Sequence, residues 1–573
     1  MESRLLIKLI LIFTITGAVL LLTNCKKDNE PLPLSEIPSI QTSEPAEGSI
    51  GTEITIKGSN FKSGASVKVG DKVSPTVEVS SGSLIYAIVP SGIPANILLT
   101  VEVKNPSGGE ASLVNAFKAI NPVLSYVNSA TRPSGNIGST VILEGNAFGD
   151  IQGGGKVLFS DGTATGTITA IIAGPDDWTN TFIVTTVPGG TMDGPVIVQT
   201  GIGKSNSIPF KVTANATFSP STINWTSTTA LPLAVSGHNA LNVSVDDASL
   251  VTNQYVYVSG GRKSDGNPTD QMIFGRITSD GRIDAWTSTT LLPSDLSFHT
   301  TVAATPFNSK AGGSGYIYVI GGINPGGTIL TTVSTGTLNN DGTIKTPWAG
   351  TKALPKPLYS AGAVIFRGSL YIVGGSTTGN VTVKNVYRAL INPDGQLGDW
   401  ETMPDLPGER SHHGLVTFGG YLYCAGGETV AGDPDAGTAG TNSDQLFYSK
   451  INLRTGELGS WTVNPNSLQK SRSKHSTLVL GGNIFITSGL YSGLSGGVQG
   501  SSENIYAVIN ADGTVGSFNG ATGSNTLFTA GGSNLFNQAG ISYIDADGVA
   551  HVMIIGGAKV GSPATKLDKI LFY

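Results

Sequence analysis

Cysteine is almost absent from this chain: Cys25 and Cys424 are the only two among 573 residues. A fold held together by a framework of disulfide bonds is therefore excluded, and stability must come from the packing of apolar side chains. Charged residues are also scarce, at 13% of the chain, and the net charge is -6 without any cluster of lysine and arginine. Binding to nucleic acid, which needs a basic surface, is therefore not expected.

Glycine, by contrast, is abundant, with 77 residues. Many short alternations of apolar and polar residues end at glycine-containing turns, which is the pattern of β-strands joined by tight reversals. These features favour an all-β protein over a helical or a disordered one. The chain is too long for one ordinary domain, so several β domains are expected.

The one long apolar run lies at the N-terminus, in residues 1–25, where Arg4 and Lys8 precede Cys25. An uncleaved transmembrane anchor is one interpretation of such a run. Its ending, LTNC at 22–25, resembles the lipobox of bacterial lipoproteins, in which the cysteine receives a lipid and becomes the first residue of the mature protein. The resemblance implies a signal peptide over 1–25 and an exported protein anchored in the cell envelope through Cys25. The outer membrane is the expected location, with exposure at the cell surface as an option.

Two similar modules follow a short connection. Residues 26–37 contain prolines and charges, and we expect them to form an extended tether. PAEGSIGTEITIKGSNF (45–61) and PSGNIGSTVILEGNAFG (133–149) each combine a glycine turn, an alternating strand and a second turn. Both resemble the opening of the immunoglobulin-like IPT/TIG domain. The resemblance implies two β-sandwich domains, at 38–119 and 120–214, that act as spacers or protein-binding units.

The remainder, 215–573, repeats one unit, whose clearest copy runs from Asn385 to Gly427. The unit predicts four strands: 385–391 before a Pro-Asp-Gly turn, 399–403 with a tryptophan after it, and then 414–418 and 421–425, the last of which is followed by Gly-Gly. The strands that close on Gly-Gly or Ser-Gly are YVYVSGG (255–261), YIYVIGG (316–322), LYIVGG (370–375), LYCAGG (422–427), IFITSG (484–489) and HVMIIGG (551–557). The turns followed by an aromatic residue are SDGRIDAW (279–286), NDGTIKTPW (340–348), PDGQLGDW (393–400), RTGELGSW (454–461) and ADGTVGSF (511–518). Because six strands but five turns are found, we expect the strand near Trp225 to pair with the strand at 566–573 and complete a sixth sheet.

These repeats resemble kelch repeats, in which a strand ending in Gly-Gly is followed by an aromatic residue and then by a tryptophan. Tyr387 with Trp400 and Tyr448 with Trp461 carry the resemblance. It implies a six-bladed β-propeller over 215–573, closed by the pairing near Trp225. The resemblance implies a fold and not an activity.

Four histidines occupy one position of the repeat, which makes them candidates for a ligand site. Equivalent positions surround the axis of a propeller, so we expect these side chains, with three polar neighbours, at its mouth. The candidate residues are His238, His299, Arg410, His412, His413, Arg472 and His475. The alternative is a packing role, because kelch repeats often carry histidine or arginine before the innermost strand. Histidines spread around a ring need not converge on one ion, and neither a metal nor a cofactor is expected.

The sequence favours a non-catalytic binding protein of the cell envelope whose ligand is a glycan or an envelope protein. One alternative is a carbohydrate-active enzyme such as a kelch-type sugar mutarotase or isomerase, in which acidic residues like Glu409 move protons. Another alternative is an adhesive or structural interaction protein. The repeat tryptophans are expected to pack between blades, whereas Tyr359 and Tyr491 are candidates for stacking on sugars. Cys424 takes a place that needs a small apolar residue, so a structural role is expected.

Overall fold

The computed structural model describes the chain in segments: 36–127, 133–135, 137, 140–172, 174–212, 221, 223–246, 252–304, 315–366, 368–392, 394–432, 440–452, 455–480, 482–492, 498–500, 503–510, 512–520, 535–544, 550–560 and 565–573. Regular structure within them is β, apart from short 3-10 turns such as η2 (Pro175–Asp177). None of the described residues belongs to a helix that is long and apolar enough to cross a membrane. The predicted signal peptide, with the lipidation of Cys25, lies outside the described residues.

The chain divides into two compact units, the first of which comprises residues up to Val123 together with 147–155 and 199–205. Its main part is a pair of sheets with strand orders β1-β3-β7-β6 and β2-β9-β8-β4-β5. The strands are β1 (Ser39–Glu44), β2 (Glu47–Gly48), β3 (Glu53–Ser59), β4 (Ser66–Val69), β5 (Lys72–Val73), β6 (Val77–Ser81), β7 (Leu84–Ile88), β8 (Leu98–Lys104) and β9 (Glu110–Ala119).

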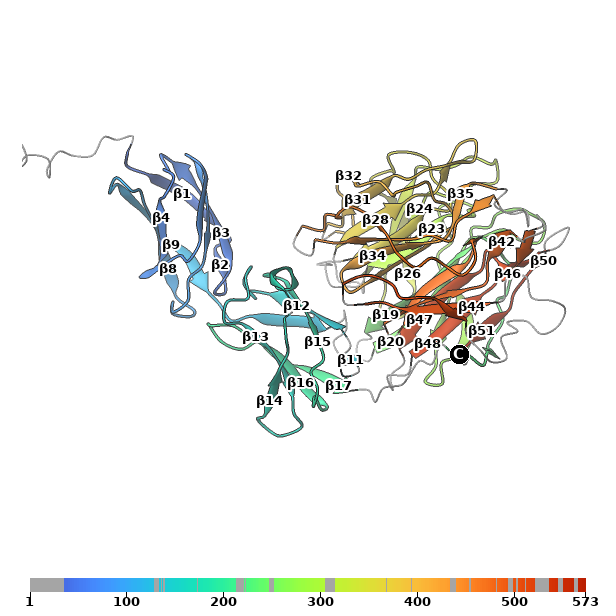
Figure 1. The fold of residues 1–573 in the computed structure, drawn as a ribbon, viewed down its shortest axis with the longest axis horizontal. Helices are drawn as coiled ribbons and strands as arrows, with labels where there is room; N and C mark the ends of the chain where they lie inside the picture. The colour runs from blue at the N-terminus through green and yellow to red at the C-terminus, as the bar shows by residue number, and fades with distance from the viewer. Residues whose placement is uncertain are drawn as a thin grey trace, which may run out of the picture. The chain divides into compact units, whose positions relative to one another are not determined.

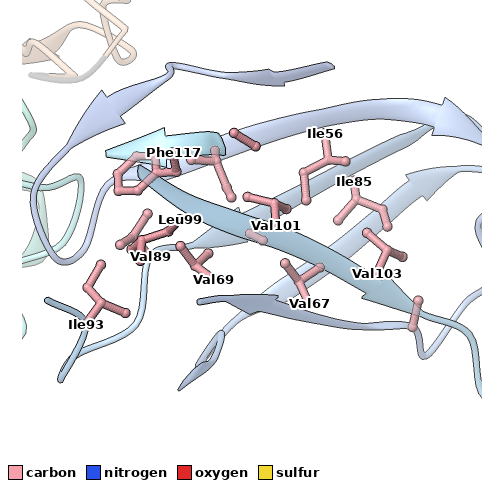
Figure 2. Packing of buried hydrophobic residues seen from close by; sticks show 14 of the residues in the cluster. Ile56, Val67, Val69, Ile85, Val89, Ile93, Leu99, Val101, Val103 and Phe117 are labelled. Atoms are coloured by element: carbon pink, nitrogen blue, oxygen red, sulfur yellow. The ribbon is translucent and has the colours of Figure 1, made fainter. Parts of the chain in front are cut away.

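Both of these sheets contribute to one apolar core, shown in Figure 2. Ile56 and Ile85 enter it from one sheet, and Val67, Val101 and Val103 enter it from the other. In β8 the buried residues alternate with partly or fully exposed ones, as expected for a strand with one face on the core. The unit is therefore a β-sandwich, as the sequence predicted for its first module.

The second unit begins with another pair of sheets, between Val123 and Val212, with strand orders β10-β12-β15 and β11-β17-β16-β13-β14. The strands are β10 (Val123–Val127), β11 (Ser134–Gly135), β12 (Thr140–Asn146), β13 (Lys156–Ser160), β14 (Thr167–Thr169), β15 (Phe182–Thr186), β16 (Gly194–Gln199) and β17 (Ile208–Val212). Apart from η2, the regular structure of these two parts of the described chain is β (Figure 1).

Six antiparallel sheets of four strands follow in the described residues, and we number them I to VI. Their strands, from the first to the fourth, are as follows: sheet I, β19 (Asn239–Asp246), β20 (Thr252–Ser259), β21 (Met272–Ile277), β22 (Ile283–Ser288); sheet II, β23 (Thr300–Ala304), β24 (Gly315–Ile320), β25 (Val333–Leu338), β26 (Ile344–Gly350); sheet III, β27 (Gly362–Phe366), β28 (Ser369–Val373), β31 (Val386–Leu390), β32 (Glu401–Met403); sheet IV, β33 (Gly414–Phe418), β34 (Tyr421–Ala425), β37 (Leu446–Lys450), β38 (Thr462–Val463); sheet V, β40 (Ser476–Leu480), β41 (Asn483–Thr487), β44 (Asn504–Val508), β45 (Asn519–Gly520); sheet VI, β47 (Ala539–Ile544), β48 (Ala550–Ile555), β51 (Ile570–Phe572), β18 (Thr226–Ser227).

Sheet VI joins two segments that are far apart in the sequence. Its strand β18 precedes sheet I in the chain but pairs with β51, so that Thr226 lies opposite Phe572 and Ser227 lies opposite Leu571. The predicted pairing of the strand near Trp225 with the C-terminal strand is confirmed. The strands predicted at 414–418 and 421–425 are β33 and β34, with the same bounds.

The first strands of the six sheets contact one another in cyclic order. Contacts run from β19 through β23, β27, β33, β40 and β47, and β47 contacts β19 again. The residue two before each first strand donates its backbone N–H to the carbonyl of the equivalent residue in the preceding sheet. The six bonds are Phe298 to Gly237 (2.8 Å), Ser360 to Phe298 (2.8 Å), His412 to Ser360 (3.1 Å), Lys474 to His412 (2.9 Å), Asn537 to Lys474 (3.0 Å) and Gly237 to Asn537 (3.0 Å). We call this closed series the backbone circle.

Every residue of the backbone circle adopts the left-handed conformation, with φ between 48° and 58°. This conformation lets one residue bond to the preceding sheet through its N–H and to the following sheet through its C=O. Glycine and asparagine tolerate it, but Phe298, Ser360 and Lys474 do so only at a cost. The hydrogen bonds on both sides hold these residues in place.

The repeated aromatic residues also join neighbouring sheets. Four of the repeat tryptophans donate their indole N–H to a carbonyl that follows the fourth strand of the preceding sheet, whereas the indole nitrogen of Trp225 has no partner within the described residues. The pairs are Trp286 with Thr229 (3.1 Å), Trp348 with Leu291 (2.7 Å), Trp400 with Lys352 (3.2 Å) and Trp461 with Pro404 (2.9 Å). The tryptophans therefore have the packing role expected from the sequence rather than forming sugar platforms.

The repeat-position histidines pack against the Gly-Gly pairs of their own sheet and of the preceding sheet. A Cβ on Gly374 would lie 3.2 Å from Cε1 of His413 in the next sheet, and a Cβ on Gly427 would lie 2.7 Å from the Cβ of His413. The same arrangement holds for His238 with Gly556 and Gly261, His299 with Gly260 and Gly322, and His475 with Gly426 and Gly489. Where Ser488 replaces the first glycine, Gln538 replaces the histidine.

Replacing Gly374 with alanine should destabilise the protein more than the same change at Gly419. Both glycines are left-handed, with φ of 59° and 57°, so each substitution should cost about 1–2 kcal/mol from the backbone alone. A Cβ at Gly374 would also lie 2.3 Å from the carbonyl oxygen of Arg410, whereas one at Gly419 would meet nothing within 4 Å. Overpacking should add about 1–3 kcal/mol for Gly374→Ala, as measured by urea denaturation. Equal losses in the two variants would contradict the inter-sheet contact.

Candidate functional site

A cavity of about 220 Å³ lies where the first strands of the six sheets begin. It is lined by the six residues of the backbone circle and by the residue that follows each of them. The lining residues are Gly237, His238, Asn239, Phe298, His299, Thr300, Ser360, Ala361, Gly362, Ala363, His412, His413, Leu415, Lys474, His475, Asn537 and Gln538. No aspartate or glutamate is among these described residues, so the wall is polar but not acidic.

The structure brings five of the seven candidate residues to this cavity, namely His238, His299, His412, His413 and His475. Their ring nitrogens are nevertheless buried between sheets. Neither nitrogen of His413 has a hydrogen-bond partner within the described residues, although that residue is partly exposed. His299 bonds through Nε2 to the hydroxyl of Ser259 (3.0 Å). These four repeat-position histidines therefore support the wall more than they present nitrogens to a ligand.

Burial keeps these imidazoles neutral. It lowers the pKa of His238 to about 4 and the pKa values of His299, His413 and His475 to about 3. The nearby guanidinium of Arg410 further lowers the pKa of His413. At neutral pH the histidines are uncharged packing groups, and they cannot attract an anion as cations would.

The two candidate arginines lie in the wall behind the cavity and do not line it. Arg410 is 2% exposed, lies over the ring of Phe447 at 4.6 Å and donates to Ser443 and Gln445. Arg472 is fully buried, and its guanidinium lies 3.4 Å from the carboxylate of Glu503. Both guanidinium groups are thus committed to bonds within the protein.

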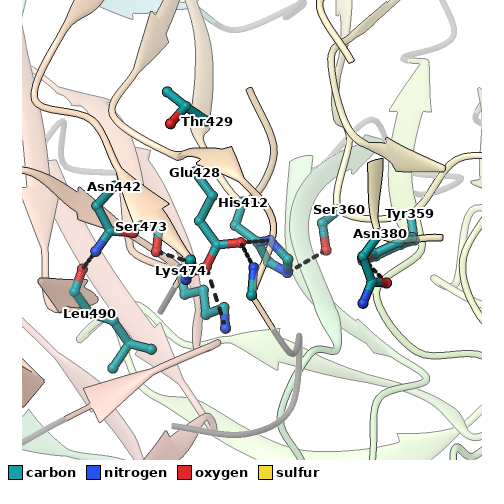
Figure 3. A network of polar contacts seen from close by, with 12 residues as sticks. Tyr359, Ser360, Asn380, His412, Glu428, Thr429, Asn442, Ser473, Lys474 and Leu490 are labelled. Atoms are coloured by element: carbon teal, nitrogen blue, oxygen red, sulfur yellow. Dashed lines mark hydrogen bonds and ion pairs between the residues drawn. The ribbon is translucent and has the colours of Figure 1, made fainter. Parts of the chain in front are cut away.

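A chain of polar contacts crosses three sheets at the cavity wall, as Figure 3 shows. The hydroxyl of Ser360 lies 2.7 Å from Nε2 of His412, and Nδ1 of His412 lies 3.1 Å from Oε2 of Glu428. Nζ of Lys474 lies 3.6 Å from Oε1 of the same carboxylate. The Nε2 contact with Ser360 is a hydrogen bond, whereas the Nδ1 contact with Glu428 is at ion-pair distance without hydrogen-bond geometry.

Glu428 is fully buried and carries a negative charge. Burial alone would raise its pKa, but His412, Lys474 and the backbone N–H of Gly440 together lower the pKa to about 2. Gly440 donates to Oε1 and Gly432 donates to Oε2, both at 3.2 Å. The pKa of His412 is lowered by burial and, to a smaller extent, by Lys474, while Glu428 opposes the shift. Glu428 is therefore held ionised by both neighbours, His412 first and Lys474 after it.

Sequence reasoning did not identify Ser360, Glu428 and Lys474. Ser360 and Lys474 occupy the repeat position just before the histidine position, and Glu428 directly follows a Gly-Gly pair. At the place of Glu428 the other repeats have Arg262, Ile323, Ser376, Leu490 and Ala558. A comparison of the repeats at these two positions would have shown the unusual charges.

Other expected ligand groups are placed as follows. Tyr359 is 1% exposed and donates its hydroxyl to Asn380, so its ring is not open to a sugar, whereas Tyr491 is half-buried beneath Nζ of Lys470 at 5.0 Å. Cys424 is fully buried, and burial raises the pKa of its thiol to about 12. No group of three His, Cys, Asp or Glu side chains within the described segments is placed to hold a metal ion.

Comparison with known proteins identifies the first module. Residues 38–118 match the IPT/TIG domain, and the chain therefore contains an immunoglobulin-like domain of this kind. Protein SPT23 of Saccharomyces cerevisiae is 32% identical to this chain over 95 residues, which cover 15% of this chain and 9% of SPT23. Because the match spans so little of that protein, its function is not transferred to this one.

We expect the protein to lose stability as the pH falls below about 6.5. The folded-state pKa values of four histidines, about 3 to 4, lie below the ordinary histidine value of 6.5, so the unfolded chain binds more protons in acid. Their stabilising effect is complete above 6.5 and is lost as the pH falls toward the folded values. Each histidine should contribute roughly 1.4 kcal/mol per pH unit to this loss. Urea denaturation between pH 8 and 5 measures it, and His413→Gln should reduce the slope; a flat profile would contradict the neutral imidazoles.

Glu428 and Lys474 should show strong coupling in a double-mutant cycle. Glu428→Gln or Lys474→Met alone leaves a buried charge without its partner, which should cost about 3–5 kcal/mol. The double variant should lose much less than the sum, because no unpaired charge is left in the wall. Denaturation of the four proteins gives the coupling free energy. Additive losses would show that the two groups are not a pair.

Proposed function

We propose that this protein is an envelope-anchored lipoprotein that displays a six-bladed kelch-type β-propeller and recognises a ligand through the axial cavity of that propeller. A glycan or an envelope protein is the proposed ligand. The proposed limits of the parts are 1–25 for the signal peptide, 26–37 for the tether, 120–214 for a second IPT/TIG-like module and 215–573 for the propeller.

The propeller proposal is supported by repetition at two levels. The repeated residues resemble kelch repeats, and the six sheets have first strands in cyclic contact. The backbone circle and the pairing of β18 with β51 are the contacts that closure of such a ring requires.

The single observation that supports ligand recognition is the polar lining of the axial cavity. Ser360, Thr300 and Asn239 are partly exposed there, and they offer hydroxyl and amide groups that suit a polyhydroxylated or peptide-like ligand. At about 220 Å³ the cavity is smaller than most small-molecule sites, which measure ~300–1,000 Å³. It therefore suits one terminal group of a ligand, the rest of which lies outside.

The anchoring proposal rests on the sequence around Cys25, which resembles a lipobox. A lipid on that cysteine and a tether after it would leave the IPT/TIG domain and the second module as spacers between the membrane and the propeller. Such a display suits a receptor for large ligands in the envelope better than a diffusible enzyme.

Full-length protein should fractionate with membranes in a Gram-negative host, and the Cys25→Ala variant should not, because it lacks the acceptor of the lipid. Both proteins should bind the same ligands, since the proposed site is in the propeller. Membrane fractionation with mass spectrometry of the N-terminal peptide tests the anchor. A glycan array and a pull-down from envelope extracts test the ligand.

The Ser360→Asp variant tests binding at the cavity. It places a carboxylate there, at a left-handed position that aspartate tolerates. Loss of binding with retained folding would place the ligand at the cavity. If Cys25→Ala remained in the membrane, or if Ser360→Asp bound every ligand unchanged, the corresponding half of the proposal would be wrong.

A further inference from the structure

Three side chains at the cavity lie in series from a hydroxyl, through an imidazole, to a buried carboxylate, joined by one hydrogen bond and one contact at ion-pair distance. Ser360 Oγ lies 2.7 Å from Nε2 of His412, and Nδ1 of His412 lies 3.1 Å from Oε2 of Glu428. Both distances are within the range of ~2.6–3.2 Å that links a nucleophile to its base and the base to the group that orients it. Ser360 and His412 lie two residues before the first strands of sheets III and IV, and Glu428 begins β35 (Glu428–Val430), which follows the second strand of sheet IV; Figure 3 shows their side chains side by side.

Each member of this series has the environment that its role requires. Ser360 is partly exposed and lines the cavity, so a substrate can reach its hydroxyl. His412 is packed edge-on against the rings of Phe298 at 6.0 Å and Tyr359 at 6.1 Å, which fix the plane of the imidazole. Glu428 has no exposed surface and accepts hydrogen bonds from two backbone N–H groups, which fix its carboxylate.

The backbone at Ser360 is strained, with φ of 48°. All six residues of the backbone circle share this conformation, so it is a property of the fold that Ser360 has in common with its equivalents. Here the strain turns the chain sharply just before β27 and leaves Ser360 beside the imidazole of the next sheet. Nucleophilic serines in hydrolases sit on comparably sharp turns.

Donors for a developing oxyanion are present beside the hydroxyl. The backbone N–H of Ala361, the residue after Ser360, has no hydrogen-bond acceptor within the described residues, and Ala361 lines the cavity. The backbone N–H groups of the equivalent residues His413 and His475 are also without an acceptor among the described residues, and both residues line the same cavity. Preorganised N–H groups of this kind stabilise the negative oxygen of a tetrahedral intermediate.

We propose that Ser360, His412 and Glu428 form an acyl-transfer site that hydrolyses short-chain carboxylic esters. This reaction goes beyond the recognition proposed above, and it departs from the expectation of binding without turnover. The volume of about 220 Å³ admits a small acyl group, such as acetyl, carried by a larger alcohol that remains outside the cavity. An acylated glycan has this chemistry, and that choice of substrate rests on the proposed function.

The reaction balances with water as the co-substrate. Ser360 Oγ attacks the carbonyl carbon while its proton passes to Nε2 of His412, and Glu428 stabilises the imidazolium through Nδ1. The ester C–O bond then breaks, and the leaving alcohol takes the proton from Nε2. Water next attacks the acyl-serine, gives a proton to His412 and releases the carboxylic acid as the proton returns to Ser360.

Lys474 does not compete with His412 for the carboxylate, because the two groups use different oxygens. Nζ of Lys474 and the hydroxyl of Ser473 lie 3.6 Å and 3.4 Å from Oε1, whereas His412 faces Oε2. Lys474 is therefore a positioning residue, which keeps Glu428 ionised and leaves its second oxygen for the imidazole.

The test uses the full chain with p-nitrophenyl acetate and with an alkyl fluorophosphonate that labels activated serines. The wild-type protein should hydrolyse the ester and carry the phosphonyl group on Ser360, as located by peptide mass spectrometry. Ser360→Gly removes the hydroxyl and relieves the left-handed strain, so its folding is not in question. This variant should lose at least ~100-fold in rate, together with all labelling at that position.

The matched control is Ser411→Ala, because the hydroxyl of Ser411 is buried and has no partner within the described residues. It should keep the rate within ~2-fold of the wild type, since it touches no reacting atom. His412→Asn, with a side chain that accepts a positive φ, should slow both hydrolysis and labelling. An unlabelled Ser360, or equal rates in the wild type and Ser360→Gly, would overturn the inference. If the wild-type protein bound a ligand but Ser360 was not labelled, the ester-hydrolysis proposal would be wrong and the recognition proposal would stand. If it showed neither binding nor labelling, both proposals would be wrong.

Discussion

The six hydrogen bonds of the backbone circle are the constraint on which the arrangement of the C-terminal sheets depends. They involve main-chain atoms alone, so they set the spacing of the sheets without regard to the side chains at these positions. Every other repeated contact follows from that spacing. The indole N–H of Trp400 can reach the carbonyl of Lys352, and His413 can enter the space above Gly374, only when neighbouring sheets are held at this separation.

Much of this fold could be predicted from the sequence because its signals are local. The β-rich runs before Gly426-Gly427 predicted β33 and β34 with the bounds that the structure has. The unequal numbers of Gly-Gly strands and turns indicated the pairing of β18 with β51. The first module was recognisable because its opening motif matches the IPT/TIG pattern, which the comparison also finds over residues 38–118.

The candidate site was less predictable, since its contacts join different repeats. Alignment of the repeats drew attention to the histidines, whose regular spacing reflects a packing contact with glycine. The reactive arrangement uses the position before them, where Ser360 and His412 differ from one sheet to the next, together with Glu428 from a place that is usually uncharged. The backbone circle places Ser360 and His412 of successive sheets side by side, and Glu428 reaches His412 from the segment after a Gly-Gly pair. These neighbours cannot be recognised from the repeats taken one at a time.

The left-handed residues around the cavity have a wider implication. This chain places Gly237, Phe298, Ser360, His412, Lys474 and Asn537 at six structurally equivalent positions, so the fold accepts an apolar ring, a hydroxyl, an imidazole, an ammonium and an amide in the same socket. The main-chain hydrogen bonds are common to all six positions, so the same backbone can carry different side-chain chemistry at each of them. A side chain with a buried partner, such as Lys474 with Glu428, has to be exchanged together with that partner if stability is to be kept.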